Sequence, residues 1–86
     1  MTYFVYLIGN YKYKRLITYA GYTNNLKKRL KLHNSGKGAK FTKGRTWKLI
    51  YYEKYRSRKE AINREYYIKK NRKFRNLIKK LSNEKK

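Results

Sequence analysis

Aromatic and β-branched positions along the chain predict three β-strands. Tyr3–Ile8 is a run of such residues that a Gly-Asn pair ends, as is typical of a strand. Leu16–Tyr22 has the same character, and the basic connector 9–15 would join the two runs as a hairpin. A third strand is expected at Trp47–Tyr52, with Tyr55 as its furthest limit.

Capping residues and helical spacing predict a first α-helix after the second strand. The Thr-Asn-Asn run 23–25 offers capping side chains, and Leu26, Leu30 and His33 then share one helical face. Arg29 lies four residues before His33, so the two side chains share one side of this helix. The following segment 34–45 contains three glycines and several cations, which indicates a flexible basic loop.

Two further helices are expected in the last third of the chain. The segment Ser57–Glu60 fits a capping box, so a helix should begin at Ser57 and run to about Lys70. Asn71 would break this helix and cap the next one. The third helix carries an apolar stripe at helical spacing, formed by Phe74, Leu77, Ile78 and Leu81.

The element order β-β-α-β-α-α predicts a small α+β domain in which helices cover a three-stranded sheet. A chain of 86 residues has room for one domain, residues 1–86, and residues 82–86 are expected to form a frayed polar tail. Because a domain of this size buries a modest core, we expect any chemistry to occupy a shallow surface cleft.

Net charge is the most informative feature of the composition. The chain has 26 lysines and arginines against 4 acidic residues, for a formal net charge of +22. Phosphate backbones are the usual partners of such a chain, although the amino-acid bias of an AT-rich genome would explain part of the charge. A membrane surface is the weaker interpretation, because the cations are not confined to one amphipathic helix. Nucleic acid is therefore the expected partner.

The chain has no cysteine and one histidine, which excludes disulfides and cysteine-based zinc sites. Its apolar run at residues 3–8 is too short for the core of a signal peptide or for a membrane span. A cytoplasmic, nucleoid-associated protein is therefore expected.

The four acidic residues are all glutamates, and this limits the catalytic chemistry. A nuclease with two metal ions needs several bridging carboxylates, which the chain can hardly supply. Glu60 would belong to the capping box and Glu84 to the tail. Glu53 would be a solvated charge near the third strand. Glu65 falls between Ala61 and Ile68 on the face that should meet the sheet. It would either pair with Arg29 or a lysine, or bind a single metal ion.

Other candidate residues also have two interpretations each. Gly21 either allows nucleic acid or a tyrosine to approach the backbone closely, or marks a β-bulge. Arg29 is a phosphate contact or a solvated cation, and His33 is a catalyst or a packed residue. The loop cations either grip phosphates or belong to a solvated turn: Lys37, Lys40, Lys43 and Arg45.

Several of these residues together resemble a known constellation. It consists of Phe4-Val5-Tyr6, Tyr19-Ala20-Gly21, Arg29, His33 and Glu65. The pattern resembles the GIY-YIG nuclease superfamily, and most closely its small standalone bacterial proteins. The run His33–Arg45 is very similar to their loop and is the most specific stretch. The resemblance covers roughly residues 2 to 80.

This resemblance implies a three-stranded antiparallel sheet flanked by helices, and phosphodiester hydrolysis with one divalent ion, Mg²⁺ or Mn²⁺. The catalytic residues that it implies are Tyr6, Tyr19, Arg29, His33 and Glu65. The metal ligand would be Glu65. The motifs depart from the family name at Phe4, Val5 and Ala20, which are backbone and packing positions.

In the mechanism that we expect, Tyr6 is the general base for an attacking water, with Tyr19 or His33 as its hydrogen-bond partner. Positive charge from Arg29 and the metal ion should lower the pKa of Tyr6. Arg29 would hold a phosphate oxygen, and Glu65 would hold the ion beside the departing 3′ oxygen.

The expected substrate is structured or branched DNA, cut without strong sequence specificity and favoured over RNA. A protein partner that targets or activates the chain is a further candidate. Many family members carry a late Asn near the site, for which Asn71 and Asn76 are the candidates. The alternatives are a non-catalytic basic binding module and a structural basic protein, neither of which requires the spaced site residues.

Overall fold

The computed structural model describes residues 1–12 and 15–84 of the chain. Their elements are β1 (Tyr3–Lys12), β2 (Arg15–Thr23), α1 (Leu26–Asn34), β3 (Lys48–Tyr55), α2 (Arg58–Lys70) and α3 (Arg72–Glu84). The predicted order β-β-α-β-α-α is confirmed.

The three strands form one antiparallel sheet in the order β2-β1-β3, so β1 is central and β2 is an edge strand. In the pairing register Tyr6 lies opposite Gly21 on β2 and opposite Tyr52 on β3. The β1–β3 ladder is irregular between Leu7 and Ile8. The predicted class, a small α+β domain with an antiparallel sheet, is therefore confirmed.

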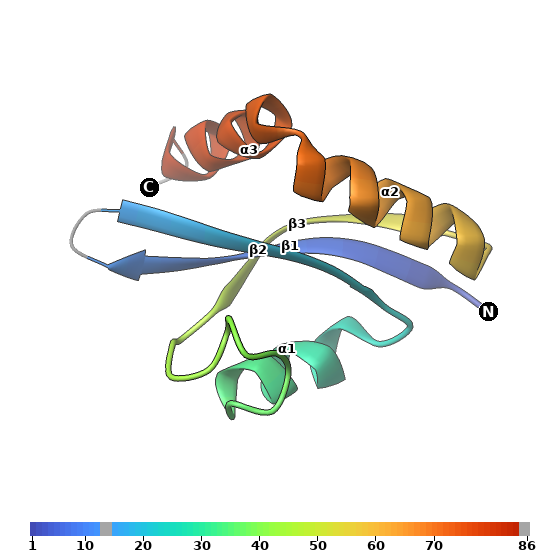
Figure 1. Ribbon diagram of the computed structural model, residues 1–86, viewed down its shortest axis with the longest axis horizontal. Helices are drawn as coiled ribbons and strands as arrows, with labels where there is room; N and C mark the ends of the chain where they lie inside the picture. Colours follow the sequence, from blue (N-terminus) through green and yellow to red (C-terminus); the bar gives the residue numbers. More distant parts are fainter. Residues whose placement is uncertain (13–14, 85–86) are drawn as a thin grey trace.

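Helices cover both faces of the sheet, with α2 and α3 on one face and α1 and its loop on the other (Figure 1). Alternate residues of β1 supply the two faces, as the period of a strand requires. Val5 and Leu7 pack with residues of α2 and α3, whereas Tyr6 and Ile8 pack with Trp47 on the α1 side. The sheet thus has a separate apolar cluster on each face. None of the described helices could cross a membrane, given their length and polarity.

Two predicted strand boundaries are wrong. The connector predicted at 9–15 is mostly strand, because backbone pairing continues to Lys12↔Arg15 whatever the polarity of the side chains. Trp47 precedes β3 and is buried as part of the loop. α3 is helical to Glu84, and the last two residues of the expected tail at 82–86 lie outside the described part.

The predicted helix caps are present. Oδ1 of Asn25 accepts a hydrogen bond from Lys28 N at 3.0 Å and so begins α1. Oγ of Ser57 accepts one from Glu60 N at 3.1 Å, and Oδ1 of Asn71 accepts one from Phe74 N at 2.9 Å. These short-range contacts fix the starts of α1, α2 and α3.

Candidate active site

A polar cleft of about 490 Å³ opens at the edge strand β2. Four of the five predicted catalytic residues line it: Tyr6, Tyr19, Arg29 and Glu65. The fifth, His33, is buried and contacts Tyr6. Because β2 is at the edge, α1 on one face of the sheet and α2 on the other can both contribute side chains to the cleft.

A chain of hydrogen bonds leads from the cleft into the protein. The hydroxyl of Tyr6 is 2.8 Å from Nε2 of His33, whose Nδ1 is 2.9 Å from Oγ1 of Thr42. The Thr42 hydroxyl donates to the carbonyl oxygen of Ala39 at 3.0 Å, so it accepts a hydrogen bond from Nδ1–H. Nε2 is therefore the unprotonated nitrogen, and it accepts the hydrogen bond of Tyr6.

The pKa shifts in this chain overturn one expectation. Burial raises the pKa of Tyr6 well above its ordinary value of 10.0, and the opposing effect of Arg29 is smaller. The expected lowering of this pKa is thus wrong for the free protein. Burial and then Arg29 lower the pKa of His33 below 6.5, so its imidazole is neutral near pH 7. Nε2 of His33 is thus the hydrogen-bond acceptor in this pair, and Tyr6 is a neutral phenol.

Gly21 makes room for the Tyr6 side chain. A Cβ atom at this position would lie 2.6 Å from Cζ of Tyr6 and closer still to its hydroxyl oxygen. The two residues are paired across β1 and β2, so the phenol ring crosses Gly21 to reach the cleft. The β1–β2 register is continuous at Gly21, so the structure supports close approach of a tyrosine and not the β-bulge.

The loop after α1, for which the sequence indicates flexibility, is folded against His33 in the structure. A Cβ atom on Gly38 would lie 2.8 Å from Cγ of the His33 ring, and Thr42 is fully buried. Nε1 of Trp47 donates to the Thr42 carbonyl oxygen at 2.9 Å, and Oδ1 of Asn34 accepts from Trp47 N at 2.6 Å. These contacts fix the imidazole ring.

The roles of Gly38 and Thr42 were not predicted from the sequence. Both lie in the run His33–Arg45, whose similarity to known loops was the available signal. The contacts of Gly38 and Thr42 with His33 form only when the loop folds back on the helix, so the spacing of residues in the sequence does not predict them.

The predicted nucleic-acid-binding cations do not line the cleft. Lys37, Lys40 and Lys43 are exposed on the loop, and the Arg45 guanidinium lies 5.3 Å from the centre of the Phe41 ring. The cleft takes its positive charge from Arg29 and from Arg58, which donates to the Tyr22 hydroxyl at 3.3 Å. Arg58 and Tyr22 were not predicted as site residues.

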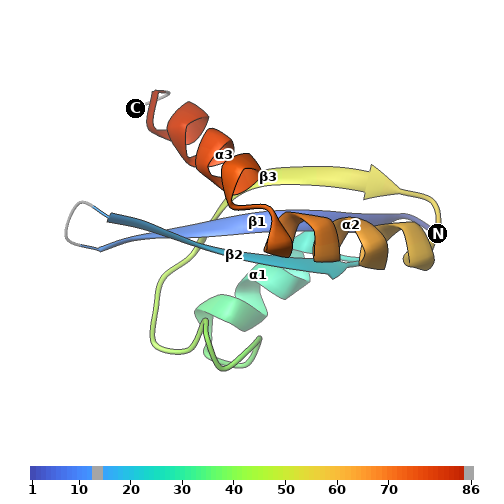
Figure 2. The same ribbon diagram turned by 45° about the horizontal axis from the view of Figure 1, so that its top comes forward.

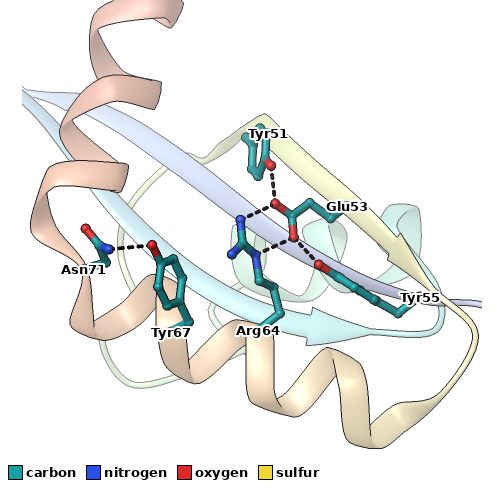
Figure 3. Close-up of polar contacts among 6 residues, drawn as sticks. All are labelled: Tyr51, Glu53, Tyr55, Arg64, Tyr67 and Asn71. Atoms are coloured by element: carbon teal, nitrogen blue, oxygen red, sulfur yellow. Dashed lines mark hydrogen bonds and ion pairs between the residues drawn. The ribbon is translucent and has the colours of Figure 1, made fainter.

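Neither candidate for the late asparagine lines the cleft. Nδ2 of Asn71 donates to the Tyr67 hydroxyl at 2.8 Å (Figure 3), and its Oδ1 caps α3. Asn76 is exposed on α3. Asn24, at the end of β2, is the amide side chain that lines the cleft instead.

Glu65 is the cleft carboxylate, and its side chain is 19% exposed. Its ion pair in the described part of the chain is with Lys69, one helical turn away, at 3.6 Å. The expected alternative of a bridge to Arg29 is not formed there. A long pair with a half-exposed lysine is weak, so it leaves the carboxylate available to a ligand.

The donor set fits a single hard divalent cation. Within residues 1–12 and 15–84 no three His, Cys, Asp or Glu side chains come together as a metal site. One carboxylate in an open polar cleft suits Mg²⁺ or Mn²⁺, which accept water and phosphate oxygens as their remaining ligands. Arg29 and Arg58 also line the cleft and would repel a cation. The negative charge of a bound phosphate would offset this repulsion.

A second carboxylate, Glu53, fixes α2 on the sheet (Figure 3). It accepts hydrogen bonds from the hydroxyls of Tyr51 and Tyr55 and two from Arg64, at 2.8 and 2.9 Å. Burial alone would raise the pKa of Glu53, but these hydrogen bonds outweigh it and lower that pKa. The predicted solvated charge is therefore wrong. Because Arg64 precedes Glu65, this network helps to set the direction of Glu65.

Comparison with known proteins agrees with this geometry. Residues 2–80 match the family model of the GIY-YIG catalytic domain. A UPF0213 protein of Clostridium perfringens (strain 13 / Type A) is 52% identical over 68 residues, which are 78% of this chain and 70% of that protein. UPF0213 protein YazA of Bacillus subtilis (strain 168) is 57% identical over 53 residues, which are 60% of this chain and 54% of that protein.

A solved structure is also similar. The solution NMR structure of a UPF0213 protein from Bacillus halodurans has a TM-score of 0.50 and 36% sequence identity to this chain. The likeness covers 94% of this chain and 85% of that one. Since the family model spans nearly all of the sequence, and the cleft gathers the motif residues, the chain belongs to the GIY-YIG nuclease family.

Proposed function

We propose that the chain is an endonuclease that hydrolyses phosphodiester bonds with one Mg²⁺ or Mn²⁺ ion held by Glu65. The observation that carries the proposal is the convergence of two features in one cleft. The Tyr6–His33–Thr42 hydrogen-bond chain ends there, and Arg29 and Glu65 line the same space. A binding module would need the positive charge but not this proton path.

The proton path gives Tyr6 and His33 distinct roles. As water attacks the phosphorus, its proton passes to the hydroxyl oxygen of Tyr6, while the hydroxyl proton passes to Nε2 of His33. This relay leaves Tyr6 neutral throughout, which its raised pKa favours. Thr42 keeps Nδ1 of His33 protonated, so that Nε2 remains the acceptor.

Charge stabilisation comes from the remaining cleft residues. Arg29 would donate to a non-bridging phosphate oxygen and stabilise charge developing at the phosphorus. When bound, the metal ion would supply Lewis-acid stabilisation to the departing 3′ oxygen. The hydroxyl of Tyr19 would contact the same phosphate, since Tyr19 lines the cleft together with Arg29.

The substrate that fits best is DNA with branches or other structure, cut without strong sequence specificity. A shallow cleft at a sheet edge contacts a phosphate backbone, and it offers few groups that read base edges. The exposed loop cations Lys37, Lys40 and Lys43, together with Gly21 in the cleft and Arg45 beside Phe41, would belong to this interface. A cytoplasmic, nucleoid-associated location and a targeting partner are part of the same proposal.

A cleavage assay tests the proposal directly. The purified chain would be incubated with duplex, single-stranded, flap and four-way-junction DNA, and with RNA, in Mg²⁺, Mn²⁺ or EDTA. We expect metal-dependent products with a preference for branched DNA. Binding without cleavage in every metal would instead support the non-catalytic basic module.

The acid limb of the rate profile should lie below pH 6.5. The relay needs neutral His33, and burial and Arg29 lower its pKa, so the active form persists as the pH falls through 6.5. Single-turnover rates between pH 5 and 8 would locate the limb. An acid limb centred above pH 6.5 would contradict the assignment of His33 as the proton acceptor.

A further inference from the structure

We propose that a groove beside α3 is a docking site for an acidic amphipathic helix of a partner protein. This α3 groove measures about 610 Å³ and is larger than the catalytic cleft. The second half of α3 runs beside the hairpin end of the sheet (Figures 1 and 2). Residues of both line the groove, and among the described residues none also lines the catalytic cleft. Tyr11, Ile50, Tyr51, Ile78 and Leu81 supply much of its apolar lining.

The apolar stripe of α3 is only partly used by the fold. Of the predicted stripe, Ile78 is buried and Phe74 packs edge-on against Tyr51. Leu77 and Leu81 remain 52% and 46% exposed. These two leucines lie one turn apart and present a ridge of the kind that packs against another helix. The stripe is therefore wider than the core of this chain requires.

Charge complementarity identifies the occupant as acidic. Lys48 lines the α3 groove, and Lys73 and Lys80 are exposed one turn to either side of Leu77. No carboxylate lines it among the side chains that the structure describes. Tyr11 also lines the α3 groove, and bases stack on such rings, so nucleic acid is the competing ligand that the test separates. An amphipathic helix with apolar and glutamate faces matches both features.

A designed peptide pair tests this proposal by binding alone, without any cleavage. The first probe is a fluorescent helix about five turns long, with leucines at helical spacing and glutamates elsewhere. The second has the same composition in scrambled order, so that it keeps the charge and loses the apolar face. We expect the amphipathic probe to bind the full chain about tenfold more tightly in an anisotropy titration.

Paired variants separate the α3 groove from general apolar contact. Leu77→Gln with Leu81→Gln should abolish the difference between the two probes, and both side chains are exposed enough for the fold to survive. Ile62→Gln is the matched control, because Ile62 is a 39% exposed aliphatic residue on α2 outside the α3 groove. It should preserve the difference.

NMR shift mapping on labelled protein completes the test. Shifts at residues 9–11, 48–51 and 78–82 on adding the amphipathic probe would support the proposal. Equal affinity for both probes, or shifts at the catalytic cleft instead, would overturn it. Displacement of the probe by a thymidine oligonucleotide, with shifts at the same residues, would also overturn it in favour of a nucleic-acid surface.

Discussion

Replacing Glu65 with glutamine is expected to lower metal-dependent cleavage by about 10³-fold or more, while nucleic-acid binding stays nearly unchanged. The substitution keeps the size of the side chain and removes the one carboxylate that lines the cleft among the described residues. The proposed metal ion would then lose its protein ligand, but Arg29 and Arg58 would still hold phosphate. Single-turnover cleavage and an anisotropy titration on the same substrate would measure the two effects.

Glu60→Gln is the control for this experiment. Glu60 is exposed in the first turn of the same helix, and its backbone N–H, not its carboxylate, contacts Ser57. This variant loses the same charge and should cleave at the normal rate. If Glu65→Gln lost binding in parallel with cleavage, Glu65 would have a structural role and the assignment as metal ligand would fail.

Gly21→Ala should lower the cleavage rate by about 10²-fold, because it displaces the Tyr6 phenol from its place over β2. The added Cβ would lie 2.6 Å from Cζ of Tyr6, so the ring has to move away from the cleft or from His33. We expect a loss of stability as well, of about 1–3 kcal/mol, since Tyr6 is buried. Single-turnover rates together with thermal unfolding would separate these effects.

Gly9→Ala makes the same change elsewhere in the sheet. The added Cβ would lie 2.8 Å from Cδ1 of Leu16, and the Leu16 side chain can rotate away. Gly9 does not line the catalytic cleft. This variant should lose some stability but retain cleavage. Equal losses of cleavage in both variants, at equal stability, would show that Gly21 has no specific role beside Tyr6.

The glutamates illustrate what sequence analysis could and could not predict. Glu60 was assigned to a helix start and Glu65 to a face that meets the sheet, and both positions follow from spacing within one helix. Glu53 was expected to be solvated, yet it accepts hydrogen bonds from Tyr51, Tyr55 and Arg64. Arg64 lies 11 residues away on another element, so spacing alone cannot reveal this partner.

The sequence alone determined the strands, the helix caps, the fold class and the candidate catalytic residues. These follow from periods and caps that act over a few residues, and from a motif resemblance that spans the chain. The tertiary structure decided that Tyr6 meets His33 across 27 residues, that Thr42 sets the tautomer, and that burial raises the pKa of Tyr6. Burial and partners depend on how distant segments pack, and a net charge of +22 does not reveal which groups lose their water.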